Sequence, residues 1–181
     1  MLRITKDSPV LFLTFVTNCR LPVFRSDRLK AIAASAFAEA AISGQFKLFA
    51  YVIMADHVHV ICSNDRTPSD TLRFLKGISA KRIIDHLKER GFDSSLRKLR
   101  NRKRGKKQSH SLWQHHSNTF FITTEFSFMQ KLNYIHLNPV KEGLTALPSE
   151  YRYSSARIWQ RKPFPDEPIQ IEIDLIEWSK R

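Results

Sequence analysis

Apolar residues dominate two neighbouring segments of the chain, residues 46–54 and 57–62, which a two-residue turn joins. The first segment is nearly continuously apolar, which is typical of a strand covered by helices. In the second, His57 and His59 flank a valine, and successive side chains of a strand point to opposite faces. We therefore predict a hairpin of two strands in which both histidines lie on one face.

Helical spacing of apolar residues marks two segments on either side of this hairpin, residues 27–43 and about 70–90. The first is rich in alanine, follows Ser26 as a candidate N-cap, and stops at Gly44. The second carries leucines and isoleucines at helical spacing and stops at Gly91. We expect one helix before the hairpin and one after it.

Two β-prone segments, residues 10–17 and 112–123, complete the order βαββαβ. This order predicts an α+β fold of the ferredoxin-like kind, an antiparallel sheet with helices on one face. A further, C-terminal helix from about residue 125 carries Tyr134. We expect it to end near Leu137, because Pro139 disfavours helical geometry at the residue before it.

The predicted elements form one domain over residues 1–160, interrupted by a basic insert at about residues 94–111. Residues 161–181 form an acidic tail whose alternating pattern predicts a strand docked on the domain. We found no sequence basis for a role of this tail, which could cover a sheet edge or shield a basic groove.

The composition of the chain disfavours disordered, membrane-spanning and disulfide-rich classes of protein. Hydrophobic residues make up 42% of the 181, which excludes a disordered chain. No apolar run approaches the roughly 20 residues that span a bilayer, and the N-terminus lacks the pattern of a signal peptide. The two cysteines are too few for a disulfide framework and indicate the cytoplasm.

The net charge of +13 indicates a polyanionic partner, with nucleic acid as the first candidate. An anionic membrane surface is the alternative, but no basic amphipathic anchor accompanies the charge, so we expect no membrane partner. Between Ser94 and Thr124 there is no Asp or Glu, which disfavours an ordinary solvated charge run. We expect this segment to contact phosphates as a loop or a helical arm. Its candidate DNA-binding residues are Arg97, Lys98, Arg100, Arg102, Lys103, Arg104, Lys106 and Lys107, and Lys131, outside the segment, is a further candidate.

The candidate chemistry is carried by the histidine pair and by the helix with Tyr134. His57 and His59, with Cα atoms about 6–7 Å apart, could converge on one cation, although a lone His-x-His is more often two half-exposed strand histidines. Lys131, Tyr134 and Asn138 share one stripe of the predicted helix. Structure alone could explain the tyrosine. The alternative is a phenol nucleophile beside a metal site that Asn138 completes with an amide oxygen.

Two other residues leave alternatives open. Asp56 could orient a histidine, bind a metal directly, or simply stabilise the turn in which it lies. His136 lies on a different side of the helix from Tyr134 and is either structural or a phosphate contact.

Three motifs, VIMADHVHVIC, YIHLNPVKEGL and the trailing YRYSSA, resemble the REP-associated tyrosine transposases. This family belongs to the single-tyrosine branch of the HUH endonucleases, and the resemblance extends from the first strand to about Trp159. It implies that His57 and His59 bind Mg²⁺ or Mn²⁺, with Asn138 as a third ligand, and that Tyr134 is the catalytic nucleophile.

The resemblance further implies an enzyme of the bacterial cytoplasm that nicks and rejoins single-stranded DNA at palindromic hairpins, with no external energy source. The intermediate is a 5′-phosphotyrosine, and the protein acts as a monomer or homodimer. The basic insert departs from the family pattern, because it lengthens the interval between the histidines and the tyrosine. The alternative function is a non-catalytic protein, derived from a transposase, that binds hairpin DNA or RNA. A hydrolase that uses a metal-bound water is weaker, because no further cluster of His and Asp accompanies the pair.

Overall fold

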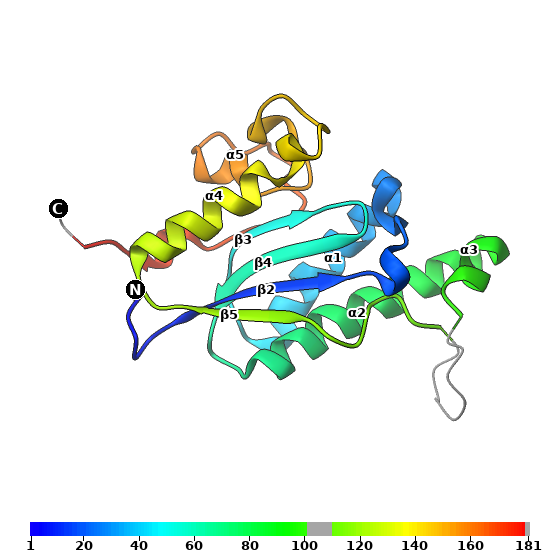
Figure 1. Cartoon of the computed structure of the whole chain (residues 1–181), viewed down its shortest axis with the longest axis horizontal. Coiled ribbons are helices and arrows are strands. Elements are labelled where there is room, and N and C mark those ends of the chain that lie inside the picture. The colour runs from blue at the N-terminus through cyan, green and yellow to red at the C-terminus, as the bar shows by residue number, and fades with distance from the viewer. Residues whose placement is uncertain (101–109, 180–181) are drawn as a thin grey trace.

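A four-stranded antiparallel sheet with the order β3-β4-β2-β5 forms the centre of the protein (Figure 1). It is seen in a computed structural model, which describes residues 1–100 and 110–179. The strands are β2 (Val10–Val16), β3 (Leu48–Ile53), β4 (His57–Ser63) and β5 (Asn118–Ile122). The predicted α+β class is confirmed.

Helices α1 (Asp27–Gly44) and α2 (Pro68–Glu89) pack against each other and cover one face of the sheet (Figure 1). Gly44 belongs to the end of α1, where a Cβ would come within 2.6 Å of the Phe46 ring. The left-handed residue that ends the helix is Gln45, with a φ of 54°. Glycine therefore serves close packing here and not the turn itself.

Helix α4 (Glu125–Lys141) lies on the other face of the sheet, across β3, β4 and β5 (Figure 1). Its buried face includes Phe128, Leu132 and Ile135, as their spacing predicts. The predicted end near Leu137 is wrong, because α4 continues through Pro139 to Lys141. A proline this close to the end removes a single helical hydrogen bond, and the carbonyls of the last turn still accept from residues 142–144.

The predicted strand at residues 112–123 is interrupted before β5. Residues 112–114 still pair with the end of β2, because Gln114 N donates to the Val16 carbonyl at 2.8 Å and Trp113 forms an isolated bridge with Thr17. At residues 115–117 the pairing stops, and Lys76 Nζ donates to the carbonyl of His115 at 3.2 Å and to Oγ of Ser117 at 3.1 Å. The regular part of the strand is β5, an edge strand of five residues.

The acidic tail lies against the domain mostly without regular structure. Ile169, Ile173 and Ile176 are buried, but only Ile176–Glu177 forms a strand, β6, which pairs in parallel with β1 (Leu2–Arg3). The outer edge of β3 is already bonded to Tyr153 and Ser155, so little of it is free for a further strand. The remaining elements are α3 (Asp93–Lys98), α5 (Ala156–Trp159) and four 3-10 turns at Asn18–Arg20, Val23–Arg25, Pro148–Glu150 and Ile173–Leu175.

Within the described ranges, no helix is both long and apolar enough to cross a membrane. Part of the basic insert is described, namely residues 94–100, most of which belong to α3, and residues 110–111. The predicted DNA-binding residues Arg102, Lys103, Arg104, Lys106 and Lys107 lie outside the described residues.

Candidate active site

The two histidines lie on the α4 side of the sheet, where strand alternation places them. Their ring centroids are 4.9 Å apart and their planes are inclined at 74°. His59 is buried, with 4% of its surface exposed, whereas His57 lies at the rim with its side chain 16% exposed. One imidazole of the pair is therefore buried and the other is partly exposed to solvent.

Each histidine is oriented through its Nδ1 atom. Nδ1 of His57 lies 2.6 Å from Oδ1 of Asp56, and Nδ1 of His59 lies 2.8 Å from Oγ1 of Thr14. A carboxylate can only accept, so His57 carries its proton on Nδ1 and a lone pair on Nε2. The Thr14 hydroxyl can accept or donate, so its contact fixes the orientation of the His59 ring, and when it accepts, His59 has the same tautomer as His57.

The turn residue Asp56 is held in its ionised form. Burial opposes its charge, but hydrogen bonds and charges of His57 and Arg20 outweigh burial and hold the pKa of the carboxyl below its ordinary value. Arg20 Nη1 lies 3.1 Å from Oδ2 of Asp56, which leaves Oδ1 for the histidine. Of the alternatives open for Asp56, the structure shows the orienting contact.

His59 is neutral near physiological pH, and one of its two ring nitrogens has no hydrogen-bond partner among the described residues. Burial, with smaller contributions from the charges of His57 and Lys131, lowers the pKa of His59 to about 3. Its Nε2 is buried and has no hydrogen-bond partner in the described part of the chain. Buried polar atoms are almost always paired, so this lone pair marks a place where a ligand or ion fits.

Tyr134 of α4 lies directly against this histidine. The ring centroids of Tyr134 and His59 are 5.2 Å apart with an interplanar angle of 74°. Phe12 of β2 completes the cluster, since it stacks on His59 at 5.6 Å and meets the Tyr134 ring edge-on at 6.1 Å. Tyr134 is 43% exposed, so its ring is held by the cluster while the side chain remains accessible to solvent.

Two lysines of α4 add positive charge around the tyrosine. Lys131 Nζ lies 5.0 Å from the ring centroid of Phe12 and 4.7 Å from that of Phe120, and Lys141 Nζ lies 5.4 Å from that of Tyr134. These cation–π contacts hold both ammonium groups beside the histidine pair. The surroundings of Tyr134 are therefore suited to an anionic substrate.

The other residues of the predicted site differ in position. Asn138 is buried, one turn beyond Tyr134, but no hydrogen bond joins it to either histidine among the described residues. His136 is buried on another side of α4, where its Nε2 lies 2.9 Å from Oγ of Ser155, and burial lowers its pKa to about 4. Of its two possible roles, the structural one fits this contact.

The donor set fits a cation that takes two neutral nitrogens and leaves positions open for substrate oxygens. No group of three or more His, Cys, Asp or Glu is placed to hold a metal in the part of the chain that the structure describes. The fit therefore depends on the Nε2 atoms of His57 and His59, and one of them is buried and unpaired. An amide or phosphate oxygen would have to complete the coordination.

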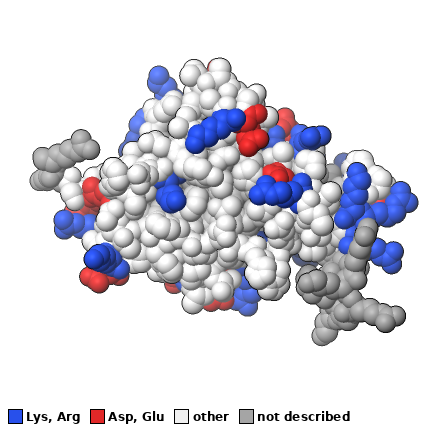
Figure 2. Space-filling view, viewed as in Figure 1, with Lys and Arg blue, Asp and Glu red and all other residues white. Residues whose placement is uncertain are grey.

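The described residues of the basic insert lie away from the histidine pair. Arg97, Lys98 and Arg100 are exposed on and just after α3, at the right-hand end of the molecule in Figure 1. Figure 2 shows Lys and Arg side chains gathered at this end, whereas the middle of the same face carries few charges. These described residues of the insert are thus not part of the active-site cluster.

Comparison with known proteins agrees with this geometry. Residues 10–96 match the family model described as Transposase IS200 like. This matched segment belongs to the IS200-like transposase family. Such transposases are generally metal-dependent tyrosine nucleases of the HUH type. The matched segment of this transposase includes His57 and His59 and ends before Tyr134.

Two solved structures are similar to this transposase. One is a REP-associated tyrosine transposase bound to a REP hairpin, with 19% identity and a TM-score of 0.61 over 91% of this chain and 87% of that one. The other is a transposase candidate from Deinococcus radiodurans R1, with 22% identity and a TM-score of 0.48 over 71% of this chain and 88% of that one. The first likeness shows a shared fold. No curated protein matches the sequence.

Sequence reasoning missed three contacts of the transposase site, those of Phe12, Thr14 and Lys141. Phe12 and Thr14 come from β2, and their closeness to His59 depends on the register Thr14↔His59 between two strands far apart in the chain. Lys141 was missed because α4 was expected to end before it. Only the spacing of Lys141 from Tyr134, two helical turns, could have indicated the contact.

Proposed function

We propose that this transposase cleaves and rejoins single-stranded DNA at hairpin elements, with Tyr134 as the nucleophile and His57 and His59 as the metal ligands. The observation that carries the proposal is the contact between the Tyr134 ring and His59, whose buried Nε2 has no partner among the described residues. An accessible phenol beside a free imidazole nitrogen is the arrangement that nucleophilic attack on a phosphodiester needs.

The reaction follows from the phenol and the phosphodiester. Oη of Tyr134 forms a bond to the scissile phosphorus, and the bond between phosphorus and the 3′ oxygen breaks. The phenol gives up its proton and the departing oxygen gains one, so a free 3′-OH and a 5′-phosphotyrosine result. Attack by a different 3′-OH reverses these steps and transfers the strand without an external energy source.

The chain's own residues bind and orient the reactants. Lys131 and Lys141 attract the phosphate and hold it near the tyrosine, while Phe12 fixes the angle between the Tyr134 and His59 rings. Thr14 and Asp56 hold both histidines through Nδ1, so that the Nε2 atoms are the ones left for a metal. A Mg²⁺ or Mn²⁺ ion held by these atoms, with Asn138 as an additional oxygen donor, would polarise the scissile phosphate.

Hairpin DNA is the substrate that the fold supports best. The relative of known structure with the same fold is bound to a REP hairpin. The strand order β3-β4-β2-β5, with α1 and α2 on one face, supports a ferredoxin-like arrangement in which α4 carries the tyrosine to the opposite face. We propose that residues 1–160 form this catalytic domain and that residues 161–181 stabilise it from outside.

The deciding experiment incubates the protein with Mn²⁺ and single-stranded hairpin DNA taken from the flanks of its own gene. Wild type is expected to form a protein–DNA adduct that survives denaturation, and Tyr134→Phe is expected to bind the hairpin equally well without forming the adduct. Hairpin binding by wild type with no adduct in either Mg²⁺ or Mn²⁺ would favour the non-catalytic alternative. An adduct that persists in Tyr134→Phe would exclude this tyrosine as the nucleophile.

A further inference from the structure

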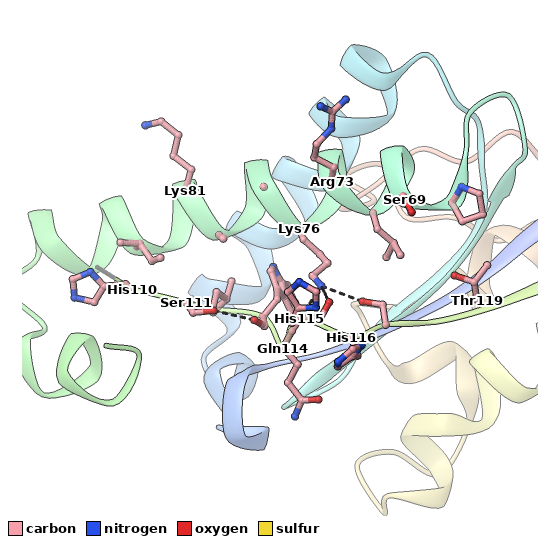
Figure 3. Close-up of a pocket in the computed structure, with 18 of the residues that line it drawn as sticks. Ser69, Arg73, Lys76, Lys81, His110, Ser111, Gln114, His115, His116 and Thr119 are labelled. Atoms are coloured by element: carbon pink, nitrogen blue, oxygen red, sulfur yellow. Dashed lines mark hydrogen bonds between the residues drawn. The ribbon is translucent and has the colours of Figure 1, made fainter. Parts of the chain in front are cut away.

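A groove of about 1000 Å³ lies between α2 and residues 110–119, on the side of the sheet that α1 and α2 cover (Figure 3). Its described lining carries many basic groups and no Asp or Glu. These groups include Arg73, Lys76, Lys81, Lys88, His115 and His116. Lining of a single charge sign concentrates the electrostatic potential inside a concave surface and attracts anions.

Lys76 places a half-buried positive charge in the lining of this groove. Its Nζ donates to the carbonyls of Gln114 and His115 and to Oγ of Ser117, at 2.6, 3.2 and 3.1 Å (Figure 3). All three acceptors are neutral, so its charge is not compensated, and burial lowers the pKa of the ammonium. An anion in the groove would offset that cost.

Acidic residues of α2 neutralise the basic side chains at the rim of the groove only weakly. Arg73 pairs with Asp70 at 3.2 Å and Lys81 pairs with Asp85 at 2.6 Å, both on the exposed surface of α2. Exposed pairs of this kind exchange readily for other partners. Lys88 has no ion-pair partner among the described residues. Phosphate groups can therefore recruit all three cations.

Gly77 leaves the α2 side of the groove without a side chain. It lies in the interior of α2, where glycine disfavours a helix, and a Cβ at this position would meet nothing within 4 Å. Its φ is not in the left-handed region, so neither the backbone nor packing requires glycine here. The absence of a side chain at Gly77 leaves space between the basic side chains of Arg73 and Lys81.

We propose that this groove binds the single-stranded DNA that continues beyond the hairpin. Apolar residues of α2, among them Leu72 and Ile84, offer contacts for bases and sugars beneath a cationic rim for phosphates. The volume corresponds to a large small-molecule site and so to a few nucleotides.

The route from the active site to the groove crosses the edge strand β5. Thr119 lines the groove, and its neighbour Phe120 points to the opposite face, where Lys131 lies 4.7 Å from its ring centroid. A DNA strand that extends from Tyr134 across Phe120 therefore reaches the groove by passing around the β5 edge of the sheet. That the groove binds DNA, and not another polyanion, rests on the proposed function.

Gly77→Glu tests the groove, because it adds a large side chain and a negative charge to the α2 side of the lining, on the face of the sheet opposite to the tyrosine. Gly77→Ala retains most of the space, and Ser35→Glu adds the same charge to an exposed position of α1 outside the groove. The binding of a labelled oligothymidylate strand is measured by fluorescence anisotropy. Gly77→Glu is expected to weaken it about tenfold, whereas both controls bind within about twofold of wild type.

Equal binding of the oligothymidylate by Gly77→Glu and Ser35→Glu would overturn the groove assignment. So would a blunt duplex that competes with the oligothymidylate as strongly as a single strand with the same number of phosphates. The adduct assay on a hairpin without a flanking strand separates this outcome from failure of the proposed function. If the groove is right, Gly77→Glu forms that adduct at the wild-type rate. If no protein forms the adduct but the anisotropy difference holds, the groove stands and the catalytic proposal fails.

Discussion

Tyr134 and His59 meet edge to face, with ring centroids 5.2 Å apart, although α2, α3 and β5 separate them in the chain. The contact forms because β4 turns the histidine toward the face that α4 crosses, while α4 buries Phe128 and Leu132 against the body of the domain. The two halves of the candidate site are thus held together by the packing of the core. Substitutions around this contact, and in the charged groups outside it, should therefore have separable effects.

His59→Gln should abolish the stabilisation of the protein by Mn²⁺. If His57 and His59 bind the ion, wild type gains about 2.7 kcal/mol when the free ion is roughly a hundred times its Kd, and the melting temperature rises accordingly. The glutamine variant lacks the buried Nε2 and should show no such rise. His86→Gln, which removes a histidine of α2, is the control that keeps it. Equal shifts in both variants would exclude His59 as a ligand.

Thr14→Val should weaken Mn²⁺ binding and destabilise the fold. The substitution leaves Nδ1 of His59 buried without its oxygen partner, which costs about 1–3 kcal/mol. It also frees the ring orientation, for which we expect a roughly 10- to 100-fold loss of metal affinity by calorimetry. Thr14→Ser keeps the hydroxyl and should retain most of the affinity. If valine and serine behave alike, the hydrogen bond has no orienting role.

Glu167→Gln should destabilise the domain strongly, because it breaks the buried ion pair with Arg157, whose Nε lies 3.0 Å from Oε1 of Glu167. Both side chains are at least 96% buried, so the arginine would keep a charge without its counter-ion. We expect a loss of about 3–5 kcal/mol in the free energy of unfolding by urea.

The neighbouring pair Arg152–Asp166 is the matched control for this prediction. Its two side chains are 42% and 74% exposed, so Asp166→Asn should leave the free energy of unfolding nearly unchanged. Similar losses from Glu167→Gln and Asp166→Asn would mean that burial does not decide the strength of the pair.

Replacing Arg97, Lys98 and Arg100 together by glutamine should flatten the salt dependence of DNA binding. These exposed cations have no acidic partner among the described residues. Each phosphate that is no longer neutralised lowers the slope of log K against log salt by about 0.7 for a single strand. The expected change for three cations is therefore about 2, with an unchanged melting temperature. A slope equal to that of wild type would show that α3 does not bind the DNA.

The chemistry-bearing residues of β4 and α4 were predictable because their placement is local. Strand alternation alone puts His57 and His59 on one face, and helical spacing alone puts Lys131 and Tyr134 on one stripe. The βαββαβ order of elements also follows from local patterns. That these patterns meet at one site depended on the resemblance and was not contained in the spacing.

The errors lie where distant contacts decide the structure. Alternation in the acidic tail agrees with the burial of Ile169 and Ile173, but Ile176 is buried outside that alternation. A strand also needs a free neighbouring edge, and β3 is bonded to other residues. Residues 112–117 are prone to β structure, yet only residues 112–114 pair with the end of β2, and three hydrogen bonds from Lys76 hold residues 114–117 beside α2. Neither the bonding of the β3 edge nor the reach of Lys76 is visible in the local sequence.

The alternation of Thr119 and Phe120 along β5 has an evolutionary consequence. One residue faces the groove and the next faces the tyrosine, so a substitution at either position acts on a different face of the sheet. Substitutions in α2 and at Thr119 could change which single-stranded DNA the descendants of this protein bind, while the catalytic face of the sheet stays constant. The sheet therefore lets recognition diverge and chemistry persist within one small domain.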